Sequence, residues 1–170
     1  MRDVENRYKG LPPRTPEMLY NIVRKFYRGA VSHYELIQEK KAEVRKAWDE
    51  CQHSGDDEQV RDSLHTLFLE YHFYTTCWLQ IDLALYRLAA DNEELARVRE
   101  AFRTILHTHL EVRRQLDDPS RCVQAQHEQT PDWSCIKEDA YSFGGIRFTV
   151  DDTSLQQLHE LYEAVQATRA

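Results

Sequence analysis

Apolar residues recur every three or four positions along two long stretches of the chain, which predicts two long amphipathic helices. The first stretch covers about residues 16–50, with apolar positions Leu19, Val23, Phe26, Ala30, Tyr34, Ile37, Val44 and Trp48. The second follows a polar break at 53–57, with apolar positions Leu64, Leu67, Tyr71, Tyr74, Trp78, Ile81, Leu85 and Leu88. Thr15, Pro16 and Glu17 are typical of a helix start, with a threonine cap, a first-turn proline and an acid.

A third helix is predicted from about residue 91 to residue 116. Asp91 and Glu94 have the spacing of a capping box at its start. Its apolar stripe consists of Leu95, Val98, Phe102, Ile105, Val112 and Leu116. We expect this stripe to be buried against the first two helices. The stripe position between Ile105 and Val112 is filled by His109, so an ionisable ring is expected at a core position.

The remaining segments differ in character. Residues 1–14 are expected to form an irregular arm, and the polar segment 117–138 a long loop. Alternating apolar residues on both sides of Gly144-Gly145 predict a β-hairpin over residues 139–150. A closing helix is predicted over residues 152–168. The expected fold class is therefore all-α: an antiparallel bundle of three long helices with a small β-hairpin and a C-terminal helix.

Composition fits one helical-bundle domain spanning residues 1–170, because the chain has 170 residues, 41% of them hydrophobic and 30% charged. No apolar run is long enough to cross a membrane, and no secretory signal is visible. The four cysteines form no C-x-x-C pair, so we expect reduced thiols and a cytoplasmic location. The net charge of -7 argues against nucleic-acid binding through the overall field. Residues 97–114 nevertheless hold five arginines against two glutamates.

The candidate chemistry lies in this arginine-rich window. Arg103 and His107 share a helix face, whereas His109 points about 120° away from Arg103. Arginine can hold a phosphate and offset developing charge, and histidine can move a proton near neutral pH, so such a site needs no metal. Asp82, next to Ile81, is a weaker candidate for orienting Arg103 or His109. The structural alternatives are a core histidine, solvated arginines and an Asp82 that pairs with Arg87 or with a neighbouring helix.

Two further groups could in principle bind metal. His65 and His72 share a helix face, but the Glu-x-x-His spacing of bundle metal sites is absent. Cys122, His127 and Cys135 lie in the expected loop without a fourth ligand at zinc-like spacing. We therefore expect no metal and no cofactor.

The segment Arg103-Thr-Ile-Leu-His-Thr-His109 resembles the motif of the HEPN superfamily, in which an arginine and a histidine on the third core helix are separated by four to six residues. The following residues 110–114 are similar to the family's continuation. A hairpin such as 143–148 followed by a helix is similar to certain abortive-infection relatives. The resemblance implies a homodimeric helical bundle from a prokaryotic defence or toxin–antitoxin system. It also implies metal-independent endoribonuclease activity and a cognate antitoxin or regulatory protein as partner.

Three interpretations follow from these observations. The first is a HEPN-like RNase that uses an Arg/His pair on RNA, with its site in a groove where two copies of the third helix meet. The second is a non-catalytic interaction module that binds a protein partner or a small ligand. The third is an unrelated bundle in which the Arg/His spacing is accidental. This third interpretation predicts a dry His109, with Arg103 directed elsewhere.

Overall fold

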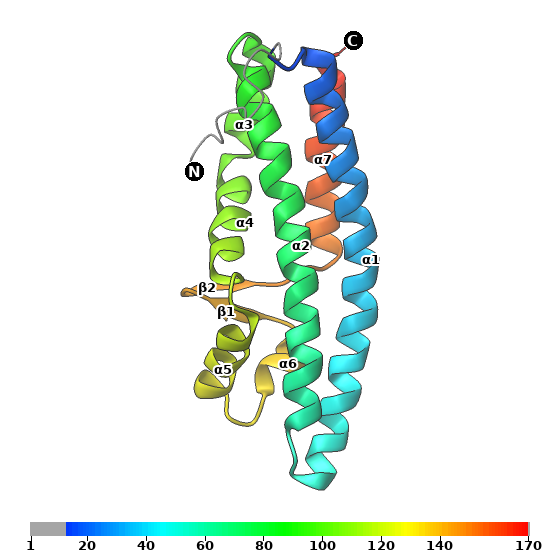
Figure 1. Cartoon of the computed structure of the whole chain (residues 1–170), viewed down its shortest axis with the longest axis vertical. Helices are drawn as coiled ribbons and strands as arrows, with labels where there is room; N and C mark the ends of the chain where they lie inside the picture. Colours follow the sequence, from blue (N-terminus) through cyan, green and yellow to red (C-terminus); the bar gives the residue numbers. More distant parts are fainter. Residues whose placement is uncertain (1–12, 170) are drawn as a thin grey trace.

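The computed structural model describes residues 13–169 as a helical bundle with one small sheet (Figure 1). The two predicted long helices are confirmed as α1 (Pro16–Ser54) and α2 (Glu58–Ala89), which pack as an antiparallel hairpin. The Thr15 hydroxyl accepts a hydrogen bond from the Met18 backbone N–H at 3.3 Å, so the predicted cap of α1 is correct. Most of the expected arm lies outside the described residues.

The third predicted helix is divided at Phe102 into α3 (Glu93–Ala101) and α4 (Arg103–Gln115). Phe102 has φ -99° and ψ 9°, outside the helical range. A stripe that repeats every 3.5 residues drifts around a straight α-helix, and the break allows both halves to face α2. Asn92, not Asp91, caps α3, because its side chain accepts a hydrogen bond from the Leu95 N–H at 3.1 Å.

Burial of the third-helix stripe differs from the prediction at its centre. Its two ends are buried as expected, at Leu95, Val112 and Leu116. The central members are only partly buried, although they pack against the core: Val98, Phe102 and Ile105. Leu106 is buried in this region instead, and His109 is buried as its stripe position predicted.

The predicted loop at 117–138 is wrong, because it contains α5 (Pro119–Gln129) and α6 (Ser134–Glu138). Asp118 caps α5 by accepting a hydrogen bond from the Arg121 N–H at 3.2 Å. Only three residues of α5 are buried, namely Cys122, Val123 and Gln126. This is too few for the helical period to show in a sequence that is otherwise polar.

The predicted hairpin is confirmed as β1 (Tyr141–Phe143) and β2 (Ile146–Phe148), which pair antiparallel. Gly144 and Gly145 both have positive φ, 57° and 81°, as a tight hairpin turn requires. The Gln126 side chain takes the place of a third strand beside β1. Its Nε2 donates to the Ser142 carbonyl at 2.8 Å, and its Oε1 accepts from the Ser142 N–H at 3.1 Å.

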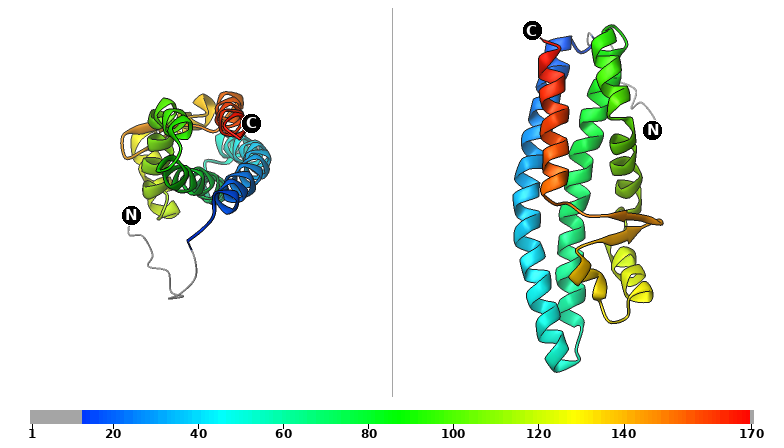
Figure 2. Two further views of the ribbon diagram at one scale, coloured as in Figure 1. Left: turned by 90° about the horizontal axis from the view of Figure 1, so that it is seen from above. Right: turned by 180° about the vertical axis from the view of Figure 1, so that it is seen from behind.

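The closing helix α7 (Asp152–Ala167) begins with a capping box formed by Asp151 and Ser154. It runs beside α1, while α3 and α4 run beside α2 (Figure 2). The hairpin, α5 and α6 occupy the part of the bundle that α7 does not reach (Figure 1). The rings between these elements form a largely aromatic core: Phe68, Tyr71, Trp78, Tyr141, Phe143 and Phe148.

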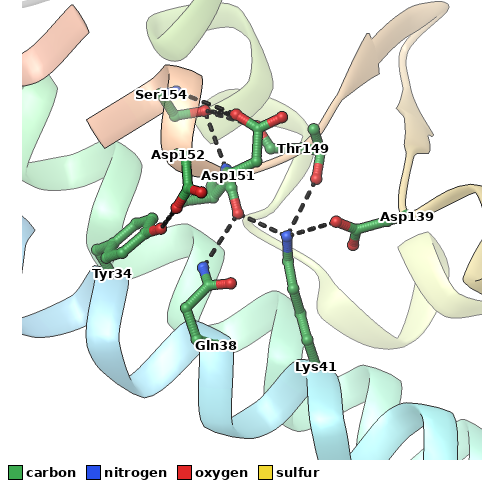
Figure 3. A network of polar contacts seen from close by, with 9 residues as sticks. Tyr34, Gln38, Lys41, Asp139, Thr149, Asp151, Asp152 and Ser154 are labelled. Carbon is green, nitrogen blue, oxygen red and sulfur yellow. Dashed lines mark hydrogen bonds and ion pairs between the residues drawn. The ribbon is translucent and has the colours of Figure 1, made fainter. Parts of the chain in front are cut away.

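A buried lysine fastens the hairpin and the start of α7 to α1 (Figure 3). Lys41 is 3% exposed, and its Nζ donates to Asp139 Oδ2 at 2.8 Å, Thr149 Oγ1 at 3.3 Å and the Val150 carbonyl at 2.6 Å. All three ammonium protons therefore have acceptors. Such a paired and fully bonded charge is the form in which lysine can be buried. We assign Lys41 a structural role.

None of the helices within residues 13–169 combines the length and the apolar character needed to span a bilayer.

Candidate functional site

A pocket of about 190 Å³ lies where α3 meets α4 and is lined by residues of these two helices and of α2. Its lining residues are Asp82, Arg99, Glu100, Arg103, Leu106, His107 and Leu110. Three of the four residues singled out from the sequence therefore line one pocket, and only His109 is outside it. The volume is below the roughly 300 Å³ at which drug-sized ligand sites begin. It suits a small ligand or one side chain of a partner.

Asp82 holds Arg99 rather than Arg103 or His109. The Arg99 Nε lies 2.8 Å from Asp82 Oδ1, and its Nη2 lies 3.4 Å from Oδ2, a forked pairing. The same guanidinium lies 5.2 Å from the centre of the exposed Tyr86 ring. Asp82 thus ties α3 to α2, as the structural alternative expected.

Arg103 and His107 are exposed residues of the pocket lining. The Arg103 side chain is 76% exposed, and its Nη1 lies 3.4 Å from Glu100 Oε1. Ion pairs between side chains as exposed as these contribute little energy. The Arg103 guanidinium is therefore available to a ligand. His107 is also exposed and shares this face, as the four-residue spacing predicts.

His109 lies on the opposite, inner face of α4 and is only 3% exposed. Its Nδ1 is 2.8 Å from the Ile105 carbonyl oxygen. Because a carbonyl only accepts hydrogen bonds, Nδ1 carries the proton and Nε2 keeps a lone pair. The ring stacks on Trp78 with centroids 4.0 Å apart and meets the Phe148 ring edge-on.

The environment of His109 keeps the imidazole neutral. Desolvation lowers its pKa from the usual 6.5 to about 4, and the hydrogen bond to Ile105 offsets this only in part. Among the described residues, Nε2 has no hydrogen-bond partner. A histidine covered by Trp78 and Phe148 is not placed to exchange protons with a substrate, so Arg103 and His109 do not form a joint site within this chain. A dry His109 is what the third interpretation expected.

The possible metal ligands do not converge. His72 Nε2 lies 3.5 Å from Asp117 Oδ1, and His127 Nε2 lies 4.0 Å from Asp57 Oδ2. Within residues 13–169, no group of three or more His, Cys, Asp or Glu residues could hold a metal ion.

The sequence did not single out four of the pocket residues, which are Arg99, Glu100, Leu106 and Leu110. Arg99 is the one that shares a helix face with the candidates. It precedes Arg103 by four residues, as Arg103 precedes His107, so the three residues follow one helix face. This spacing was a usable signal. The pairing of Arg99 with Asp82 was not predictable in the same way, because the two residues are on different helices.

Comparisons with protein-family models, with curated proteins and with solved structures find no match to this chain.

Proposed function

We propose that this chain is a HEPN-like helical-bundle protein of a prokaryotic defence or toxin–antitoxin system that acts in the cytoplasm as a non-catalytic interaction module. Its ligand, or one side chain of a protein partner, enters the pocket between α3 and α4. The burial of His109 carries the non-catalytic part of this proposal, because the histidine of the Arg/His pair lies in the core with its pKa lowered to about 4. The HEPN-like part rests on the resemblance of residues 103–109 to the family's motif.

The pocket supports a binding role on chemical grounds. Leu106 and Leu110 provide apolar surface, while Arg103 and His107 offer hydrogen-bond donors. Asp82 and Arg99 form a rigid wall because each is held by the other. A few placed polar groups around an apolar lining are typical of ligand sites.

A second candidate function is metal-independent RNA cleavage through Arg103 and His107. The observation that favours it is that both residues line one pocket. Arg103 would hold the phosphodiester, and His107 would take the proton of the 2′-hydroxyl as it attacks phosphorus. As the 2′-oxygen bonds to phosphorus, the bond from phosphorus to the 5′-oxygen would break, and the leaving 5′-oxygen would take a proton from water. The products would be a 2′,3′-cyclic phosphate end and a 5′-hydroxyl end, and the reaction would proceed in the presence of EDTA.

One experiment separates the two functions. Purified protein is incubated with mixed RNAs in EDTA, beside the exposed-residue variants Arg103→Gln and His107→Gln and the core variant His109→Phe. Intact RNA in every sample is expected for the interaction module. Cleavage that requires Arg103 and His107 but survives His109→Phe would establish the second function and overturn the first.

We also propose that the chain forms a homodimer, as the HEPN resemblance implies. Large apolar side chains are exposed on α1 and α2, at Leu36, Leu69 and Phe73. Such surface is often covered by a partner. Light scattering at micromolar concentration should give about twice the chain mass of 20.2 kDa. A mass equal to one chain would contradict the dimer.

A further inference from the structure

Four of the five arginines on α3 and α4 form ion pairs, which are Arg97–Glu93, Arg99–Asp82, Arg103–Glu100 and Arg114–Glu111. Arg113 is different. Within residues 13–169, the only hydrogen bond or ion pair of its guanidinium runs from Nε to the Thr76 hydroxyl oxygen at 3.0 Å. The charge of Arg113 is therefore not matched by a carboxylate, even though the protein as a whole is acidic.

Thr76 fixes the direction of this guanidinium. Its hydroxyl donates to the His72 carbonyl at 2.7 Å, which leaves a lone pair to accept the Arg113 Nε–H. The two terminal nitrogens of Arg113 keep their N–H donors for another partner. Arg113, Thr76 and His72 are all partly exposed, so this partner can come from solvent.

The carboxylate nearest in sequence does not provide that partner. Asp117 follows Arg113 by four residues, but its Oδ1 lies 3.5 Å from His72 Nε2. Two polar contacts therefore join α4 and its C-terminal end to α2. One runs from Arg113 to Thr76, and the other from Asp117 to His72. His72 precedes Thr76 by four residues on α2, so the two side chains share a face of that helix.

We propose that Arg113 and His72 form a binding site for a phosphoryl group, with Thr76 as a positioning residue. The planar fork of a guanidinium matches two oxygens of a phosphate or a carboxylate. A phosphoryl group has a third oxygen that can accept from His72, which a carboxylate lacks. Arg113 does not line the α3–α4 pocket, so this site is independent of the proposed function.

The test is a titration of the whole chain with inorganic phosphate at constant ionic strength, with chloride as the balancing anion. The NMR signals of the His72 ring and of the Arg113 Nε–H report binding. We expect saturable shifts, and a Kd at least 10-fold higher in Arg113→Gln, because a charge-assisted hydrogen bond is lost. Arg114→Gln is the matched control. It removes the same charge one residue away, and its Kd should stay within 2-fold of the wild type.

Two further variants keep the test decisive if Arg113→Gln does not fold. Arg113→Lys retains the charge without the fork, and Thr76→Val removes the positioning hydroxyl, so both should raise the Kd several-fold. Acetate in place of phosphate tests the preference for a phosphoryl group, and a nucleoside monophosphate tests whether the phosphate of a larger ligand is accepted. The proposal is overturned if phosphate shifts neither signal in the wild type. It is also overturned if Arg114→Gln weakens binding as much as the Arg113 variants, or if acetate binds as tightly as phosphate.

Discussion

The outer and the inner face of α4 each carry a histidine, one exposed to solvent and the other buried in the core. On the outer face, His107 and Arg103 are exposed beside a small pocket. On the inner face, His109 is stacked on Trp78 and keeps a neutral ring. His107 and His109 are two positions apart, so the helix rotation alone decides which histidine meets water. Residue type and spacing therefore identify a candidate site only after the buried face of the helix is known.

The largest effect is expected from removing the ring against which His109 packs. Trp78 is fully buried, so Trp78→Ala should lower the free energy of unfolding by about 3–5 kcal/mol. Urea denaturation at pH 7 measures this loss. An effect below about 1 kcal/mol would contradict the description of the inner face as closely packed.

Acidification should also lower the free energy of unfolding, because His109 on the inner face of α4 is held neutral. The unfolded chain takes up a proton at His109 near pH 6.5, whereas the folded chain does so only near pH 4. The unfolded state thus binds more protons in this interval, and stability falls as the pH drops from about 6.5 to 4. At about 1.36 kcal/mol per unit of difference, the contribution of His109 totals about 3 kcal/mol.

His109→Phe isolates that contribution, because it keeps an aromatic ring on Trp78 and removes the titration. The pH dependence of the free energy of unfolding should become shallower between pH 6.5 and 4 in this variant. Equal slopes in the variant and the wild type would show that the buried histidine is not the source.

A smaller effect on stability is expected from breaking the ion pair between α2 and α3. Asp82→Ala removes the forked pairing with the partly exposed Arg99 and should cost about 1 kcal/mol. Glu100→Ala breaks the exposed pairing with Arg103 and should change stability by much less. Thermal unfolding of the two variants side by side checks this order, and a reversed order would mean that the fork does not hold α3 on α2.

The smallest effect is expected on the outer face itself. Arg103→Ala and His107→Ala should change the free energy of unfolding by less than about 0.5 kcal/mol, as is usual for exposed positions. Denaturation curves that overlay the wild type would permit any loss of binding in these variants to be assigned to the pocket. A loss above 1 kcal/mol would place either side chain in the packing of the bundle.

The parts of this fold that the sequence could predict are those with a strong local signal. The three–four spacing from Leu64 to Leu88 is unbroken, so α2 was evident, and Gly144-Gly145 marked the hairpin. The break at Phe102 was not predictable, because the stripe of the third helix continues across it. The sequence did not predict α5, because only three residues of this helix are buried and the rest of the segment is polar.

The candidate site was likewise predictable only where the signal is local. That His109 fills a stripe position followed from spacing, as did the shared face of Arg103 and His107. The rings that cover His109 come from α2 and β2, and the carboxylate that holds Arg99 comes from α2. Their positions depend on packing between elements, which one sequence does not specify.

The amide of Gln126 has a consequence for the behaviour of this protein at high concentration. A strand with a free edge can recruit the same strand from another molecule, and this is how many soluble proteins begin to aggregate. Here the backbone groups of Ser142 on that edge are occupied by a side chain from α5. A single residue, Gln126, thus occupies the backbone groups on one edge of the hairpin. An insertion that lengthened β1 would add backbone groups that Gln126 cannot bond, and these would form an edge that can pair with another molecule.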